Sequence, residues 1–178
     1  MCIRDSSTLP TGDRRVTWVE GTSIGNVGIS MVARQVNFDW TKNADGSVEG
    51  TVQCLGQGVT REDGEMLTAG VVTHSSATDG PSTQDSATSD GIAGYLHVFA
   101  FTGTSCTVAI QESSDNGSSD AFTAKATFAA ASGVTAERIT ASGAVEAWLR
   151  VSSSGTFSNC QFAVMYRRGT AEDDLTYA

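Results

Sequence analysis

Apolar and polar residues alternate along much of this chain, most regularly between Gly91 and Arg168. The alternating segments there are short, and each ends in a turn rich in Gly, Ser, Asn or Asp. Alternation with a period of two lets a strand present one face to a core and the other to water. The pattern therefore predicts an all-β protein whose second part, residues of about 73–169, is an antiparallel β-sandwich.

Six strands are predicted within this sandwich. The segment Tyr95–Phe101 is apolar on nearly both faces, which indicates a central strand that is covered on both sides. The other five segments alternate, and they are 106–111, 122–128, 136–140, 145–151 and 160–166. A turn at Ser152–Gly155 separates the last two. Leu149 and Phe162 are expected in the core, where their removal would cost about 2–5 kcal/mol.

The first part of the chain carries one strong hairpin signal. Residues 35–41 and 47–55 alternate on either side of the turn Asn43–Gly46, whose Asp-Gly step favours a tight turn because glycine tolerates positive φ. A short extended piece is expected at residues 16–18. The segment Arg61–Leu67 is a candidate for a single helical turn.

A change in composition suggests where the parts meet. From Thr73 to Gly91 nearly every residue is Ser, Thr, Asp, Ala or Gly, which predicts a linker or a long surface loop. A domain boundary is therefore expected near residue 72, between a partial β-domain of hairpins at 7–72 and the sandwich at 73–169. Residues 1–6 look like a non-native leader without the apolar stretch of a signal peptide, and 170–178 are expected to form an acidic flexible tail.

Composition limits the classes of partner. The chain has 178 residues, a hydrophobic share of 39% and a net charge of −9. This apolar share is sufficient for a core, so wholesale disorder is not expected. An acidic surface repels phosphate backbones, so specific nucleic-acid binding is disfavoured. No segment approaches the roughly 20 apolar residues of a membrane-spanning helix, and no membrane association is expected.

The four cysteines, Cys2, Cys54, Cys106 and Cys160, match no zinc or redox spacing. The last three are in phase with apolar strand residues, so they are expected to be buried, reduced thiols that behave as small hydrophobic groups. A disulfide between Cys106 and Cys160 is left open.

Two patterns resemble parts of hydrolase or metal sites. Gly21–Gly25 matches the G-x-S-x-G motif around Ser23, but that motif needs a following helix, and Asn26-Val27-Gly28 begins none. The only histidines are His74, in the polar stretch, and His97, in the most apolar strand, with no ligand or triad partner at suitable spacing. His97 is expected to be a packed strand residue whose ring is satisfied by a neighbour.

Three further motifs are interpreted as local structure. Thr41–Gly46 begins like a calcium loop, but its twelfth position is Val52 instead of a bidentate Glu, so it is a turn. Gly56–Arg61 has Arg where a dinucleotide fingerprint needs its third Gly. Asn116–Ser118 fits a glycosylation sequon and, more simply, a hairpin tip. The dispersed loop aspartates could line a weak cation site, but nothing fixes their geometry, and they are Asp79, Asp85, Asp90, Asp115 and Asp120.

Trp18, Trp40 and Trp148 are candidate sugar-stacking platforms if they are exposed. Packing in a core or at a subunit interface is favoured for them, although Trp148 lies in phase with polar neighbours and keeps the sugar interpretation open. No catalytic, cofactor-binding or metal-binding residue is therefore predicted, and the chain is not expected to be an enzyme.

Read as a whole, residues 91–168 resemble a domain of tailed-phage virion proteins. The segments that carry this resemblance are Gly94–Val98, Phe101–Thr104, Val108–Asn116, Ala136–Ile139, Leu149–Val151, Gly155–Phe157 and Phe162–Val164. Upstream, Ile24–Asn26, Gly46–Val52 and Met66–Gly70 look like the closing strands of a phage tail tube protein. The family's tube domain is longer before Trp18, so the resemblance implies a truncated barrel at 7–72, and whether it closes is left open.

The resemblance implies a function in assembly. Members of that family form stacked rings that make the inner tube of the tail, with a sandwich domain displayed outside. The chain is accordingly expected to be a non-enzymatic structural protein of the virion, a tail tube or tail-surface component, that assembles with itself and with other phage tail proteins. The alternative is a carbohydrate-binding or host-adhesion sandwich in which Trp148 and loop aspartates contact glycans. An esterase built on Ser23 ranks third.

Overall fold

The computed structural model describes residues 12–169, apart from the side chains of Phe38 and residues 57–60. These residues form nine β-strands and no helix, which confirms the predicted all-β class. Their bounds are β1 Arg14–Val19, β2 Val27–Lys42, β3 Val48–Met66, β4 Val72–His74, β5 Thr78–Gln84, β6 Ile92–Ser113, β7 Thr123–Thr127, β8 Thr135–Ala141 and β9 Trp148–Arg168. No helix there is long and apolar enough to cross a membrane. The predicted leader at 1–6 and tail at 170–178 lie outside the described residues.

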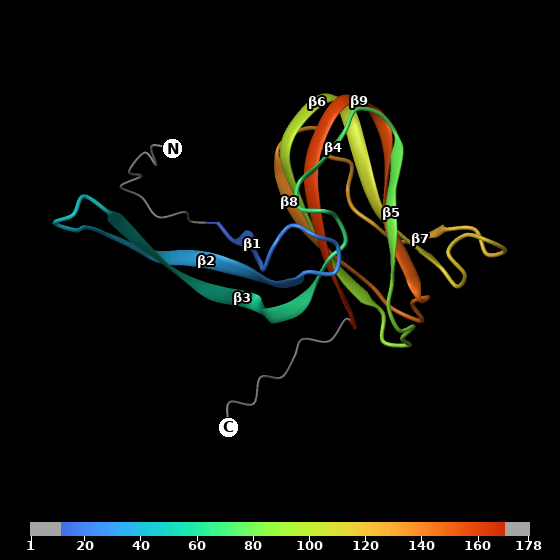
Figure 1. Ribbon diagram of the computed structural model, residues 1–178, viewed down its shortest axis with the longest axis horizontal. Coiled ribbons are helices and arrows are strands. Elements are labelled where there is room, and N and C mark those ends of the chain that lie inside the picture. Colours follow the sequence, from blue (N-terminus) through green and yellow to red (C-terminus); the bar gives the residue numbers. More distant parts are fainter. Residues whose placement is uncertain (1–11, 170–178) are drawn as a thin grey trace.

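All nine strands belong to one antiparallel sheet. Its main order is β1-β2-β3-β9-β6-β7, while β4 and β5 also pair with β9 and β8 pairs with β6 (Figure 1). The order has open ends at β1 and β7, so the sheet does not close into a barrel.

The sandwich arises because the two longest strands, β6 and β9, bend in their middles. At the bend, Gly103 has φ +150° and Gly155 has φ +113°, and the ladder shifts register around Gly103. The fold-back is tight, since a Cβ added to Gly94 would lie 2.7 Å from Cδ1 of Ile110, sixteen residues along the same strand. One layer consists of the first half of β6 and the second half of β9, with β8, and it faces the other layer across a core. That other layer consists of the second half of β6 and the first half of β9, with β5 and β7.

The predicted turn at Ser152–Gly155 is wrong, because β9 continues through it. Gly155 and the register shifts opposite it bend the strand without ending its pairing with β6. The predicted strands 145–151 and 160–166 are for the same reason largely one strand, and so are 95–101 and 106–111.

The core between the two layers contains the side chains that the sequence placed there. Leu149 and Phe162 are fully buried, and Phe128 is only 1% exposed. The prediction that Tyr95–Phe101 is covered on both sides is confirmed for Tyr95 and Leu96, which are both buried but belong to opposite faces of the sheet. Phe99 is the exception, because it is 52% exposed.

Two further predictions of local structure are wrong. Arg61–Leu67 is not a helical turn, because residues up to Met66 continue β3. The polar stretch Thr73–Gly91 is not simply a linker or loop, since it contains most of β4 and all of β5, both hydrogen-bonded to β9. Small polar residues can serve there because an added strand is held by its backbone hydrogen bonds. The domain boundary near residue 72 stays a prediction.

The base of the β2–β3 hairpin is tied to the sandwich by a buried ion pair. Glu62 on β3 is fully buried, and its carboxylate accepts two hydrogen bonds from Arg138 on β8, at 2.7 and 2.8 Å, and one from the hydroxyl of Tyr95. Burial by itself would raise the pKa of Glu62, but the hydrogen bonds from Arg138 and Tyr95 outweigh it and hold that pKa below its usual value.

Candidate functional site

The G-x-S-x-G motif does not form the geometry that a nucleophile needs. Ser23 lies exposed in the turn between β1 and β2, and its backbone N–H donates to the side-chain oxygen of Asn26 at 2.6 Å. Strand β2 follows the motif where a helix would be needed. Both histidine rings are hydrogen-bonded to other residues, His97 to Thr17 and His74 to Ser153, and not to Ser23.

The two histidines have separate, structural environments. Nε2 of His97 and Oγ1 of Thr17 on β1 share a hydrogen bond of 2.8 Å, which confirms that His97 is a packed strand residue with a satisfied ring. Nδ1 of His74 lies 2.7 Å from Oγ of Ser153, and its ring packs edge-on against Phe162. Burial lowers the pKa of both rings, although Asp79 partly opposes the effect at His74.

The cysteines follow the prediction in the core but not on the hairpin. Cys106 and Cys160 are free and fully buried, and burial together with a hydrogen bond to Cys160 raises the pKa of Cys106 to about 12. Such thiols are unreactive. Cys54 is also free but only half-buried, because it lies on β3 where the hairpin leaves the body. Cys2 lies outside the described residues.

The loop carboxylates stabilise loops. Asp45 accepts hydrogen bonds from the backbone and hydroxyl of Ser47, which confirms Thr41–Gly46 as a turn. Asp115 accepts from three backbone N–H groups of the loop before β7, where Asn116 and Gly117 have positive φ. In the part of the chain that the structure describes, no group of three or more metal-type side chains is found.

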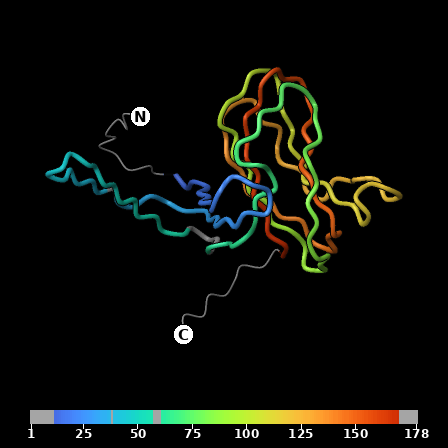
Figure 2. Tube along the Cα trace, viewed as in Figure 1, coloured from blue at the N-terminus to red at the C-terminus, as the bar shows by residue number. Residues whose placement is uncertain are grey.

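The feature with the clearest functional potential is the hairpin that projects from the body, here called the arm and comprising residues 34–55. In Figure 2 it extends far from the sandwich, and apart from the β2–β3 pairing it has no strand partner among residues 12–169. A two-stranded ribbon is at best marginally stable by itself in water. Within the described part of the chain, the arm is therefore held together only by its own two strands.

The two faces of the arm differ in chemistry. Register pairs Trp40 with Gly50 and Lys42 with Val48, so these residues share one face with Val52. The opposite face is polar and consists of Asn37, Asp39, Thr41, Glu49, Thr51 and Gln53. Trp40 and Val48 are each 62% exposed and Val52 is 55% exposed, so the apolar face lies open to solvent.

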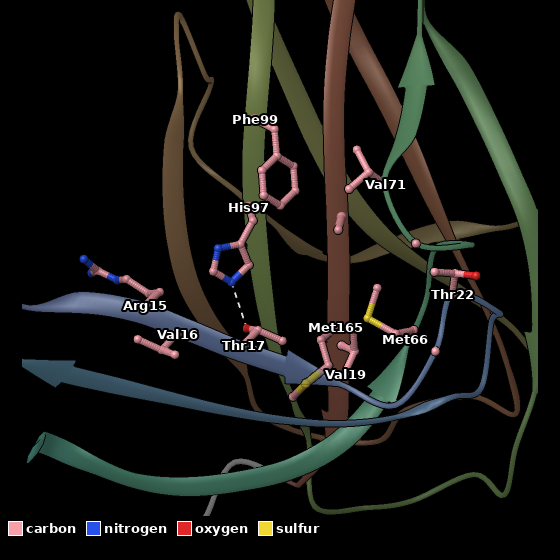
Figure 3. Close-up of a pocket in the computed structure, with 13 residues that line it drawn as sticks. Arg15, Val16, Thr17, Val19, Thr22, Met66, Val71, His97, Phe99 and Met165 are labelled. Atoms are coloured by element: carbon pink, nitrogen blue, oxygen red, sulfur yellow. Dashed lines mark hydrogen bonds between the residues drawn. The ribbon is translucent and has the colours of Figure 1, made fainter. Parts of the chain in front are cut away.

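A groove of about 430 Å³ lies at the base of the arm, between β1 and the outer face of the sandwich (Figure 3). Val16 and Val19 of β1 line one side, and His97, Phe99 and Met165 line the sandwich side. Val71, from the loop after β3, is 53% exposed at its edge. Its only charged lining residue is Arg15, so the groove is an open, largely apolar surface.

Sequence reasoning missed this groove. The sequence signal for the groove was Phe99. If its strand is covered on one face only, this apolar side chain faces outward. The three tryptophans also differ from one another: Trp18 and Trp40 are exposed, whereas Trp148 at the start of β9 is half-buried.

Comparison with protein-family models, with curated proteins and with solved structures finds no match to this chain. The proposals below therefore rest on the geometry of the arm and groove and on the sequence resemblance described above.

Proposed function

We propose that this chain is a non-enzymatic structural protein that assembles with copies of itself, as a tail tube or tail-surface component of a tailed phage. The observation that carries the assembly proposal is the uncovered apolar face of the arm. Contiguous exposed apolar surface in a folded protein marks an interaction site. Trp40 is suited to anchor such a contact, because tryptophan is prominent among the residues that dominate binding energy at interfaces.

The phage component of the proposal comes from the sequence resemblance, and the architecture is compatible with it. A sandwich with a projecting hairpin offers two unlike surfaces, and contacts between unlike surfaces generate rings when the rotation closes. Localisation in the virion and contacts with other tail proteins follow from the same proposal. The genes beside the coding sequence test it: we expect tail genes there, and neighbours from an unrelated metabolic operon would contradict it.

The assembly proposal is tested by sedimentation velocity and negative-stain microscopy of the full chain over a range of concentrations. We expect discrete rings, tubes or oligomers that grow with concentration. Trp40→Ser should weaken them, whereas Thr51→Ser on the polar face of the arm should not. A wild-type protein that remains monomeric at every concentration would refute the proposal.

The glycan-binding alternative stays a prediction. Its candidate residue, Trp148, is half-buried, so a smaller part of its ring is available for stacking on a sugar than at Trp40. Binding on a glycan array that Trp148→Ala abolishes, in a protein that does not assemble, would favour adhesion over assembly.

A further inference from the structure

Strand β1 forms an open edge of the sheet. Among the described strands it pairs with β2 alone, and it stands at the end of the main strand order. In an antiparallel pair, the backbone groups of successive residues point alternately toward the partner strand and away from it. Glu20, directly after β1, donates its N–H to the carbonyl of Val27 at 2.9 Å, in register with the β1–β2 pair. The N–H and C=O groups of Arg15, Thr17 and Val19 therefore point to the open side.

The groove runs along this open edge. Residues 15–17 and Val19 of β1 line it, and no described residue of β2 does. Figure 3 shows β2 on one side of β1 and the side chains of Phe99 and Val71 on the other. Both of these side chains are more than half exposed. The sandwich therefore provides an apolar floor beside a row of open backbone hydrogen-bonding groups.

An added strand satisfies both features at once. The open edge of a sheet can pair with an extended peptide through its backbone, and pockets beside the edge receive every second side chain of that peptide. Oγ1 of Thr17 is hydrogen-bonded to Nε2 of His97, so Thr17 faces the sandwich and its neighbours Val16 and Trp18 face away. Both neighbours are exposed, and they offer cross-strand contacts to the remaining side chains of the peptide.

The folded β1 edge of a second copy does not fit this position. Antiparallel pairing of two β1 edges would place both sandwiches on the same side of the joined sheet. The sandwich that Thr17 contacts through His97 in one copy would then occupy the space of the other sandwich, which already lies under the groove. The occupant is therefore an extended segment that has no folded layer of its own beneath it.

Charge at one end of the edge specifies the occupant further. Arg14 and Arg15 are both exposed at the start of β1. The adjacent carboxylate of Asp13 is already paired with Arg34 at 2.9 Å. The two arginines attract a carboxylate on a strand opposite them, because oppositely charged cross-strand pairs are stabilising. In the antiparallel arrangement that continues the pattern of the sheet, this carboxylate lies at the C-terminal end of the added strand.

We propose that the groove binds an extended segment of another protein as an additional antiparallel strand on β1. The segment has about the six residues of β1, with alternate apolar side chains toward Phe99 and Val71 and an acidic residue beside Arg14 and Arg15. This inference goes beyond the proposed self-assembly and does not rest on it, because the arm takes no part in the contact.

The probe for the test is the peptide acetyl-Val-Thr-Val-Thr-Val-Glu-amide, titrated into the dilute full chain by calorimetry. With its Glu opposite Arg14, the backbone groups of its valines face β1 and those of its threonines face away. N-methylation of the central valine should raise the dissociation constant at least about tenfold, because it removes a hydrogen bond to the edge. N-methylation of the next threonine is the matched control and should change it by less than about twofold.

Variants of the protein test the charge and the floor. Arg14→Glu with Arg15→Glu should weaken binding of the peptide at least about fivefold, and a peptide with Lys in place of Glu should bind this variant better than it binds the wild type. Phe99→Ser with Val71→Ser should also weaken binding, whereas Val134→Ser should not, because Val134 is exposed and lies outside the groove. All the replaced side chains are exposed, so the variants should fold, which thermal unfolding checks.

Three results would overturn the inference. The first is that the peptide does not bind the dilute wild type, and the second is that both methylations weaken its binding equally. The third is that the wild type prefers the peptide with Lys. Each of these leaves the proposed self-assembly untouched, because that is tested separately by sedimentation and Trp40→Ser.

Discussion

Glu62 carries the only fully buried carboxyl group in the part of the chain described by the structure. A carboxylate can remain charged in such a place only when it is paired and its oxygens are hydrogen-bonded. Arg138 and Tyr95 supply those bonds from two different strands, β8 and β6. One residue thereby fixes how the base of the hairpin sits against the sandwich.

Replacing this carboxylate should be costly. We expect Glu62→Gln to lower the free energy of unfolding by about 3 kcal/mol, because it leaves the largely buried guanidinium of Arg138 without a counter-charge. Its matched control is Asp63→Asn in the next position, whose ion pair with Arg61 is exposed and should contribute at most about 1 kcal/mol. Urea unfolding of both variants measures the difference in their free energies of unfolding. Equal losses of unfolding free energy would show that the buried ion pair stabilises the fold no more than the exposed one.

The two histidines predict a dependence of stability on pH. Burial lowers the pKa of His74 and His97 in the folded state below the ordinary value of 6.5, so the folded protein binds these protons less readily than the unfolded chain does. Stability is therefore complete above about pH 6.5 and falls as the pH drops through the folded-state pKa values. Glu62, whose folded pKa is lowered from 4.5, adds a further loss in more acidic solution.

We expect His97→Gln to make unfolding free energy less sensitive to pH just below 6.5, as measured by urea titrations at several pH values. His74→Gln should remove the other part of the same dependence, so the two variants serve as controls for each other. If neither variant changes how steeply the free energy of unfolding falls with pH, groups other than these histidines cause the loss of stability.

At the scale of elements, the bends in β6 and β9 determine the architecture. Gly103 lies where the sheet folds over, with φ +150°, and a Cβ at this position would lie 2.4 Å from the Cα of Phe157. No other residue type tolerates both the backbone angle and the close approach.

Gly103→Ala should therefore lower the free energy of unfolding. A strained backbone angle by itself costs about 1–3 kcal/mol, and we expect a loss of at least this size. Gly133→Ala is the control, because Gly133 does not have positive φ and a Cβ there would meet no atom within 4 Å. Thermal unfolding followed by circular dichroism compares the two. Similar melting temperatures would mean that the bend does not need glycine at this position.

The sequence predicted the elements whose signal is local. The hairpin around Asp45-Gly46 and the buried positions of Leu149 and Phe162 follow from turn chemistry and alternation, and the structure confirms them. The continuation of β9 through Ser152–Gly155 could not be predicted, because a bend within a paired strand has the same composition as a turn between two strands. Likewise, β5 is held by its pairing with β9, and its own residues give no strand signal.

The candidate site was harder to predict for a related reason. Alternation identified the hairpin strands, but it could not show that no part of the sandwich packs against the apolar face of the arm. The groove forms only when β1 crosses the sandwich and brings Val16 near Phe99, which lie 83 positions apart in the sequence. Ser23 and the loop aspartates matched chemical motifs by residue type alone, and the structure places them in turns and loops.

At the scale of the whole molecule, a well-packed sandwich carries an arm that has little packing of its own. Backbone amides exchange with solvent through local opening, and two-stranded, solvent-exposed ladders open most easily. The arm should therefore be the least protected strand region of the monomer. If it forms the contact between copies, assembly should change its protection more than that of any other strand.

Hydrogen exchange followed by mass spectrometry measures this directly at low and high protein concentration. We expect amides of residues 36–53 to exchange quickly in the dilute monomer and to slow on assembly. The core residues of β6 and β9 on either side of their bends, such as Leu96, Ile110, Leu149 and Phe162, should be protected in both states and serve as the internal reference. The Trp40→Ser variant should show the unprotected pattern at both concentrations. Protection of the arm in the dilute monomer would contradict the open hairpin, and slowing confined to β7 would place the contact between copies at the other end of the main strand order.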